Sequence, residues 1–261
     1  MFALERQKRI LEILNNDGSV WVSKLSDELG VTEETVRRDL EKLEKQEVLV
    51  RTHGGAIPLG DSASYDLSLE KRKQTNSVAK ERLAKEAAKY LLPGDTIFLD
   101  SSTTTFYMAK EIKKIKNLTV ITHSLRVINE LAGVDSIKLI TVGGIVSANQ
   151  SFVGTLAENT IRNNFFASKV FFSSKGIKSD AGILESNEQE CFIKQQVLAN
   201  ANETYYLCDS SKIDKVGFYK LAPLDSIDYF ITDCELKEDY LNRFIEYDIQ
   251  YVKVEKEQTN K

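Results

Sequence analysis

The sequence predicts two domains, a small helical one followed by a larger one of the α/β class. Three observations lead to this prediction. At 261 residues the chain exceeds what one small module needs and leaves roughly two hundred residues for a domain with a full core. Residues 1–57 carry apolar residues at helical spacing, whereas residues 76–261 alternate short β-rich runs with helical segments. Between them, residues 58–75 include a turn-prone stretch of small residues that begins at Pro58 and Gly60, which predicts a linker.

The first domain is expected to contain a helix at 4–15, a short extended segment at 20–22 and a second helix at 24–29. Ile10, Leu11 and Leu14 give the first helix an apolar face. Ser23 is expected to cap the second helix, and Gly30 is expected to end it in a tight turn.

A third, longer helix is expected to follow Thr32, which is a good N-cap residue. Acidic residues occupy its first turn, where they suit the helix dipole, and Val36, Leu40 and Leu43 recur as a narrow buried stripe. A β-rich run at 48–50 and a Gly-Gly bend come next. This order is that of a winged helix-turn-helix, whose second motif helix inserts into the major groove of DNA.

The exposed face of this helix carries the residues expected to meet DNA. Arg37 is expected to grip guanine with two hydrogen bonds, and Thr35 is expected to touch a thymine methyl group. For the arginine pair taken alone, an ordinary solvated helix face is the alternative. His53 is expected to meet phosphate or to hydrogen-bond locally. Four basic residues are expected to neutralise phosphates: Lys24, Arg38, Lys42 and Arg51. The full set of candidate DNA-binding residues is Lys24, Thr32, Thr35, Arg37, Arg38, Lys42, Arg51 and His53.

Overall charge does not favour DNA binding. The chain has 35 Lys+Arg against 39 Asp+Glu and a net charge of -4. Acidic residues also outnumber basic ones within residues 1–57. Binding therefore depends on where the basic residues lie, and non-specific affinity is expected to be weak and strongly salt-dependent.

The composition also limits where the protein works and what it contains. The N-terminus is charged almost at once, and no apolar run reaches membrane-spanning length, so we expect a cytoplasmic protein without a membrane partner. Cys191, Cys208 and Cys234 are odd in number and far apart, which favours reduced thiols. With His53 and His123 as the only histidines, we expect neither a metal site nor a cofactor.

The second domain is expected to be a doubly wound, mostly parallel α/β sheet, because strands alternate with crossover helices. The expected strands are 96–100, 118–122, 137–142, 169–173, 204–208, 229–232 and 249–254, and the expected helices are 78–92, 105–112, 125–131, 156–164, 188–200 and 237–247.

Ligands of such sheets bind beyond the carboxyl ends of the strands. The run 100–105 offers five consecutive hydroxyls that lead into a helix, a combination that suits a phosphate monoester, although an ordinary helix cap is the alternative. Glu190 and Lys194 are four apart on a helix, which favours a surface ion pair over a ligand role. The candidate effector-binding residues are Asp100, Ser101, Ser102, Thr103, Thr104, His123, Gly143, Gly144, Lys175, Lys194 and Lys212.

Residues 31–40 with Leu43, together with the run 51–56, resemble the N-terminal signature of the DeoR family of bacterial transcription regulators. The second domain resembles the sensor domain of that family, whose fold is similar to that of ribose-5-phosphate isomerase. This second resemblance rests on 100–104, 122–124, Gly143, Gly144, Gly154, Lys175, Gly176, Glu190, Lys194 and 209–212. The family usually has glycine where Ser102 stands and asparagine where His123 stands, so the ligand is not inferred from relatives.

The resemblance implies a transcriptional repressor of a sugar operon that a phosphorylated sugar releases from double-stranded operator DNA. We expect a homo-oligomer, a dimer or a tetramer, because paired half-sites match two-fold protein symmetry. Two alternatives stay open. One is a sugar-phosphate isomerase or deaminase with a DNA-binding appendage, for which Asp100, Glu185, Glu190 or Asp209 would be the general base, although no spacing marks a catalytic residue. The other is an activator of the same architecture.

Overall fold

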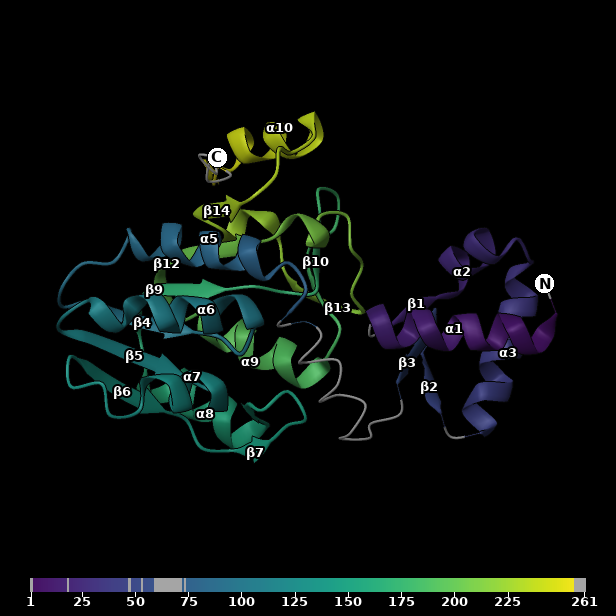
Figure 1. Ribbon diagram of the computed structural model, residues 1–261, viewed down its shortest axis with the longest axis horizontal. Coiled ribbons are helices and arrows are strands. Elements are labelled where there is room, and N and C mark those ends of the chain that lie inside the picture. The colour runs from purple at the N-terminus through teal and green to yellow at the C-terminus, as the bar shows by residue number, and fades with distance from the viewer. Residues whose placement is uncertain are drawn as a thin grey trace, which may run out of the picture. The chain divides into compact units, whose positions relative to one another are not determined.

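The computed structural model describes residues 2–17, 19–46, 48–52, 54–58, 72 and 74–255. The chain folds as two compact units, residues 1–71 and 72–261, and each is described by itself (Figure 1). The predicted linker at 58–75 lies mostly outside the described residues, so the predicted domain bounds remain predictions.

The first unit is a winged helix-turn-helix, as predicted. Its helices are α1 (Ala3–Asp17), α2 (Val22–Leu29) and α3 (Glu33–Lys45), and its strands are β1 (Val20–Trp21), β2 (Leu49–Thr52) and β3 (Gly55–Pro58). The strands form an antiparallel sheet in the order β1-β3-β2, in which β2 and β3 make the wing.

The core of this unit follows the predicted pattern. Val36, Leu40 and Leu43 of α3 are buried together with Ile10 and Leu14 of α1. Two of the predicted helix ends, at Thr32 and Gly30, are correct. The Thr32 hydroxyl accepts a hydrogen bond from the Thr35 N–H at 3.3 Å, and Gly30 ends α2 in the left-handed region at φ 63°.

The predicted cap at Ser23 is wrong, because α2 begins one residue earlier, at Val22. The Val22 side chain is buried, and its N–H donates to the Gly54 carbonyl at 2.8 Å. Backbone from the wing therefore satisfies a helix-start N–H that a side-chain cap would otherwise serve.

The second unit is built on a parallel sheet of seven strands, which confirms the predicted fold class. The order across the sheet is β15-β14-β12-β9-β4-β5-β6, and every neighbouring pair is parallel. The strands are β4 (Thr96–Leu99), β5 (Leu118–Thr122), β6 (Ile137–Thr141), β9 (Ala167–Phe172), β12 (Ala201–Cys208), β14 (Tyr229–Thr232) and β15 (Gln250–Lys253).

Helices cover both faces of this sheet, as a doubly wound fold requires (Figure 1). On β4, Ile97 and Leu99 face one core and Phe98 faces the other, because successive side chains of a strand point to opposite faces. One core includes α5 (Ser77–Ala88), α6 (Thr103–Glu111) and α7 (Leu125–Leu131), and the other includes α8 (Thr155–Asn164), α9 (Glu188–Leu198) and α10 (Glu238–Glu246).

Two small antiparallel sheets were not predicted. One joins β7 (Ile145–Val146) to β8 (Phe152–Val153), and the other has the order β10-β11-β13, from Gly176–Lys178, Gly182–Glu185 and Tyr219–Ala222. Strands of two to four residues are too short to show a periodic pattern. The second sheet matters for the site, because β11 ends at Glu185. Among the described helices, none combines the length and the apolar character that a membrane crossing would require.

Candidate functional site

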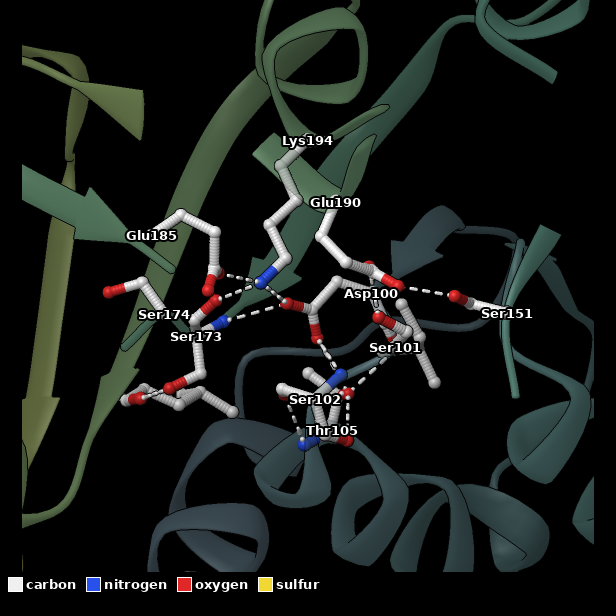
Figure 2. A network of polar contacts seen from close by, with 12 residues as sticks. Asp100, Ser101, Ser102, Thr105, Ser151, Ser173, Ser174, Glu185, Glu190 and Lys194 are labelled. Atoms are coloured by element: carbon white, nitrogen blue, oxygen red, sulfur yellow. Dashed lines mark hydrogen bonds and ion pairs between the residues drawn. The ribbon is translucent and has the colours of Figure 1, made fainter. Parts of the chain in front are cut away.

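Polar residues follow four neighbouring strands of the large sheet, and all of them are buried. Asp100, His123, Ser173 and Asp209 come directly after β4, β5, β9 and β12, and each is at most 1% exposed. Because parallel strands end at the same edge, these residues gather there. Burial of so many polar groups requires partners for them, and the structure provides a network of such partners (Figure 2).

Asp100 lies in the middle of the network. Its carboxylate accepts hydrogen bonds from the Ser102 N–H at 3.0 Å, the Thr105 hydroxyl at 2.7 Å and the Ser173 N–H at 3.1 Å. Burial opposes ionisation, but the charge of Lys194 and these hydrogen bonds outweigh it, so the pKa of Asp100 is lowered. Asp100 therefore ties the start of α6 to the end of β9 as a carboxylate.

Lys194 of α9 reaches Asp100 from the other face of the sheet. Its ammonium group lies 2.7 Å from a Glu185 oxygen, 2.8 Å from the Ser173 carbonyl and 3.2 Å from Asp100 Oδ2. Burial would lower the pKa of Lys194, but the charges of Glu185 and Asp100 raise it instead. The expected surface pair of Glu190 and Lys194 is wrong, because both side chains are buried and Lys194 pairs with other acids.

Glu190 forms a second part of the network. One carboxylate oxygen accepts from the Ser101 hydroxyl at 2.6 Å and lies 3.4 Å from His123 Nε2, and the other accepts from the Ser151 hydroxyl. Burial opposes its ionisation, but the contact with His123, the charge of Lys194 and the Ser101 hydrogen bond lower the pKa of Glu190. Its oxygens are thus occupied by the protein's own donors.

A group of basic residues lies beside these strand ends. Lys212 donates to the Ser173 hydroxyl at 2.5 Å, and Arg126 donates to the Ser101 carbonyl. Lys80 is buried and donates to the Arg72 carbonyl at 2.5 Å and the Thr75 carbonyl at 2.7 Å. We call Arg72, Lys80, Arg126 and Lys212 the basic cluster.

The basic cluster brings four cations near one another, and the Asp209 carboxylate lies 3.9 Å from the Lys212 ammonium group. Burial and, after it, the charges of Lys212, Arg72 and Arg126 together lower the pKa of Lys80 to about 8, although the charge of Asp209 opposes them. A buried ammonium group next to other cations is in an unfavourable position unless an anion joins it. The cluster therefore has the charge of an anion-binding site.

Lys80 and Arg126 are not among the residues predicted from the sequence. A signal for Lys80 is present, because Lys80, Leu83, Ala84 and Ala87 occupy one face of α5 at helical spacing and all four are buried. A lysine is rarely buried without a partner, and a cation is disfavoured near the N-terminus of a helix, so a lysine at this place in the apolar stripe indicates a functional residue. Arg126 shows no comparable pattern.

The five hydroxyls of residues 101–105, after β4, have different hydrogen-bond partners. The Ser102 hydroxyl accepts from the Thr105 N–H at 3.1 Å as the cap of α6, and Thr105 bonds Asp100. Ser101 bonds Glu190. Thr103 is 7% exposed, and the buried Thr104 hydroxyl has no hydrogen-bond partner within the described part of the chain. Capping thus explains two of the hydroxyls but not the whole run.

The remaining candidates for effector binding are Gly143, Gly144 and Lys175. Gly143 and Gly144 lie between β6 and β7, and a Cβ atom on Gly144 would come within 2.8 Å of the Val153 carbonyl oxygen. Close packing against β8 therefore accounts for Gly144. Lys175 follows Ser174 and is half-buried. For all candidates, an effector-binding role remains a prediction.

In the first unit, most of the predicted DNA-binding residues lie on α3 or on the wing, while Thr32 caps α3 and Lys24 lies on α2. Arg37, Arg38 and Lys42 are exposed on α3, and Arg51 is exposed on β2. Lys24 is exposed on α2. His53 lies outside the described residues. A direct DNA contact of any of these residues remains a prediction.

Asp39, also on α3, was not singled out from the sequence. It is 2% exposed and accepts hydrogen bonds from Arg6 Nε at 2.5 Å and Gln7 Nε2 at 3.0 Å. Its spacing from Val36, Leu40 and Leu43 puts it on the buried stripe, which is the signal that sequence reading passed over. This ion pair fixes α3 against α1.

Among the described residues, no group of three or more His, Cys, Asp or Glu side chains is placed to hold a metal ion.

Comparisons with known proteins cover both units. The model of the DeoR-like helix-turn-helix domain matches residues 6–59, and that of the DeoR C terminal sensor domain matches residues 75–234. The chain is 42% identical to the uncharacterized HTH-type transcriptional regulator YulB of Bacillus subtilis, over 90% of this chain and 91% of the relative.

Two further relatives have names that refer to sugars. The L-fucose operon activator of Haemophilus influenzae is 34% identical over 95% of this chain and 98% of the relative. The lactose phosphotransferase system repressor of Streptococcus mutans is 35% identical over 93% of this chain and 96% of the relative. Among solved structures, ribose 5-phosphate isomerase A from Methanocaldococcus jannaschii matches with a TM-score of 0.41 and 19% identity, over 54% of this chain and 56% of that chain.

Proposed function

Because the chain belongs to the DeoR family of transcriptional regulators, we propose that it represses a carbohydrate operon and that a phosphorylated sugar releases it from operator DNA. The first unit binds the operator and the second unit binds the sugar phosphate. A protein that binds an operator in this way works in the cytoplasm. The names of the lactose and fucose relatives support a carbohydrate operon.

The observation that carries the effector proposal is the basic cluster itself, in which the buried Lys80 lies among Arg72, Arg126 and Lys212 beside the ends of the parallel strands. A phosphate monoester carries close to two negative charges at neutral pH and three strong acceptor oxygens. Bound among Lys80, Lys212 and Arg126, it would relieve the repulsion between these cations. The start of α6, with Thr103 and Thr104, adds hydroxyl donors beside the cluster.

Release requires that the effector distinguish between two states of the protein. A sugar phosphate lowers operator affinity only if it binds the DNA-incompetent state more tightly than the DNA-bound state, and a coupling of about 1 to 3 kcal/mol is ordinary for such regulators. We further propose a homo-oligomer, a dimer or a tetramer, because one small module buries little DNA surface and paired half-sites match a two-fold axis.

Enzymatic turnover of the sugar phosphate is the less favoured function. A general base works best with a pKa near the working pH. The pKa values of Asp100, Glu190 and Asp209 are all lowered, in spite of burial, by neighbouring lysines and hydrogen bonds. These carboxylates are poor bases, and the family to which the chain belongs is one of regulators.

The test is a thermal-shift screen of the full chain against phosphorylated sugars and the same sugars without phosphate. Binding to the folded state raises the apparent stability, so a phosphosugar should raise the melting temperature and its plain sugar should not. The same phosphosugar should then release the protein from a duplex taken from upstream of the operon it controls. A duplex that is bound equally with and without every phosphosugar would contradict the proposal.

The sign of regulation has its own test. An activator of the same architecture is the second candidate, because one relative is named as an operon activator. Reporter expression should rise when the gene is deleted if the protein represses, and it should fall if the protein activates.

A further inference from the structure

Glutamates neutralise most of the basic residues on the predicted DNA-binding face. On α3, Arg37 Nη2 lies 2.6 Å from a Glu33 oxygen, Arg38 Nε lies 3.3 Å from Glu34, and Lys45 lies 2.9 Å from Glu41. On the wing, Arg51 Nε lies 2.8 Å from Glu44. Each α3 pair places the glutamate four residues before the base, the favourable direction for a helix.

The fold has little need of these pairs. The side chains of both partners in each pair are 36–73% exposed, and ion pairs with this exposure contribute little to stability because water and salt screen them. For a protein that binds a polyanion, the glutamates are also a disadvantage, since each one repels phosphate. The helix dipole favours acids in the first turn of α3, but it does not require that they pair with the arginines of the predicted DNA-binding face. A role of this pairing in DNA binding can therefore be tested separately.

Arg37 and Glu33 have a geometry that gives them such a role. A guanidinium has five N–H donors, and Glu33 contacts Arg37 through Nη2 alone. Enough donors remain for the two parallel hydrogen bonds that arginine makes to guanine. Glu33 can therefore stay paired while Arg37 reads a base, and the pair restricts the guanidinium to fewer orientations.

We propose that Glu33 is a positioning residue that determines DNA specificity. It holds Arg37 for a base edge in the operator and resists the transfer of Arg37 to a phosphate on other DNA. On non-operator DNA, a phosphate contact by Arg37 brings the phosphate close to the Glu33 carboxylate, and the two negative charges repel each other. The inference rests on the proposed function, since it takes α3 as the helix that reads the operator.

The test compares two glutamate substitutions in the full chain. Glu33→Gln keeps the side-chain shape and an acceptor oxygen but removes the charge. Glu41→Gln makes the same change in an equivalent ion pair, with Lys45, in the last turn of α3, away from the half that reads bases. The probes are a duplex that the wild-type protein selects from a random-sequence pool and a scrambled version of that duplex. Affinities are measured by fluorescence anisotropy over a series of salt concentrations.

Glu33→Gln should raise affinity for the scrambled duplex roughly two- to fivefold, the effect of losing one exposed ion pair, without raising affinity for the selected duplex. The selectivity ratio should therefore fall. The log–log salt dependence on the scrambled duplex should steepen by about 0.9, because Arg37 now neutralises one more phosphate. Glu41→Gln should raise both affinities alike and leave the ratio unchanged.

An unchanged ratio in Glu33→Gln, or an equal fall in both variants, would overturn the role of Glu33, because charge removal alone would then explain the data. Either result would leave the proposed function intact as long as the wild-type protein selects a duplex. A wild-type protein that selects no duplex would overturn the proposed function and this inference together.

Discussion

Lys80 and Lys212 lie close enough beside the ends of the parallel strands for their charges to repel each other. Burial and this repulsion lower the pKa of Lys80 from 10.5 to about 8. Lys80 is therefore charged at neutral pH and loses its charge in the mildly alkaline range. This property gives the proposed effector site a pH dependence that can be measured.

Affinity for the phosphorylated effector should fall as the pH rises through about 8, because deprotonation of Lys80 removes a cation from the site. The phosphate is already close to a dianion above pH 7, so its own charge does not change in this window. Isothermal titration calorimetry at pH 7 and pH 9 measures the effect. Lys80→Arg should keep its charge at both values and show little pH dependence. Equal wild-type affinity at both pH values would remove Lys80 from the site.

The same pKa has the opposite consequence for stability in the absence of effector. The folded-state pKa lies below the unfolded value, so the unfolded chain binds more protons between about 8 and 10.5. The free energy of unfolding should therefore increase as the pH rises through this window. Below about 8, both states are protonated and the full destabilisation is present.

Thr103→Val with Thr104→Val should leave DNA binding intact and abolish release by the effector. Valine matches threonine in size, and the buried Thr104 hydroxyl has no partner among the described residues, so the fold loses little. An operator-release titration with the effector, beside a melting curve of each protein, measures this. Normal release by the double variant would mean that the phosphate is held elsewhere.

Glu190→Gln should destabilise the second unit by about 1 to 3 kcal/mol at neutral pH, because the folded state favours the charged form in spite of burial. Because the pKa of Glu190 is lowered in the folded state, its contribution to stability is present above 4.5, the pKa of a glutamate in the unfolded chain, and is lost as the pH falls below that value. Urea denaturation at pH 7 and pH 4 should therefore show a smaller loss of stability on acidification in the variant than in the wild-type protein.

The elements of the fold were predictable because they carry long, regular patterns. The stripe of Val36, Leu40 and Leu43 located α3, and the alternation of strands and helices located the parallel sheet. The positions after the strands pointed to Asp100 and His123 for the same reason, since parallel strands end together. Local pattern and topology were sufficient for these features.

The partners of buried charges were not predictable in this way. Lys194 pairs with Glu185 and Asp100, which lie nine and ninety-four positions away in the sequence, and not with its helical neighbour Glu190. Spacing on one helix predicts contacts only for exposed residues, because a buried residue meets whatever packs against its helix. Arg72, Lys80 and Arg126 of the basic cluster were not predicted, although Lys212 was, because the cluster joins positions 72–80, 126 and 212, which lie far apart in the sequence.

Asp39→Asn should destabilise the first unit by about 3 kcal/mol, because it removes the negative charge to which the buried Arg6 side chain donates. Trp21 is the only tryptophan of the chain and belongs to β1, so its fluorescence reports unfolding of this unit alone. Replacing the pair with apolar residues, Arg6→Met with Asp39→Leu, should recover most of the stability, because well-packed apolar side chains often replace a buried ion pair at no net loss. No recovery in the double variant would show that the site needs the polar pair.

Arg37→Ala should lower operator affinity by about 1 to 3 kcal/mol, the contribution of one arginine that reads a guanine with two hydrogen bonds. Lys42→Ala is the matched comparison, because Lys42 is exposed on the same helix but is predicted to contact phosphate. It should weaken operator and scrambled duplexes by similar factors and reduce the log–log salt slope by about 0.9. Anisotropy titrations with both duplexes separate the two roles. If Arg37→Ala instead weakens both duplexes alike, Arg37 contacts the backbone and another residue of α3 reads the base.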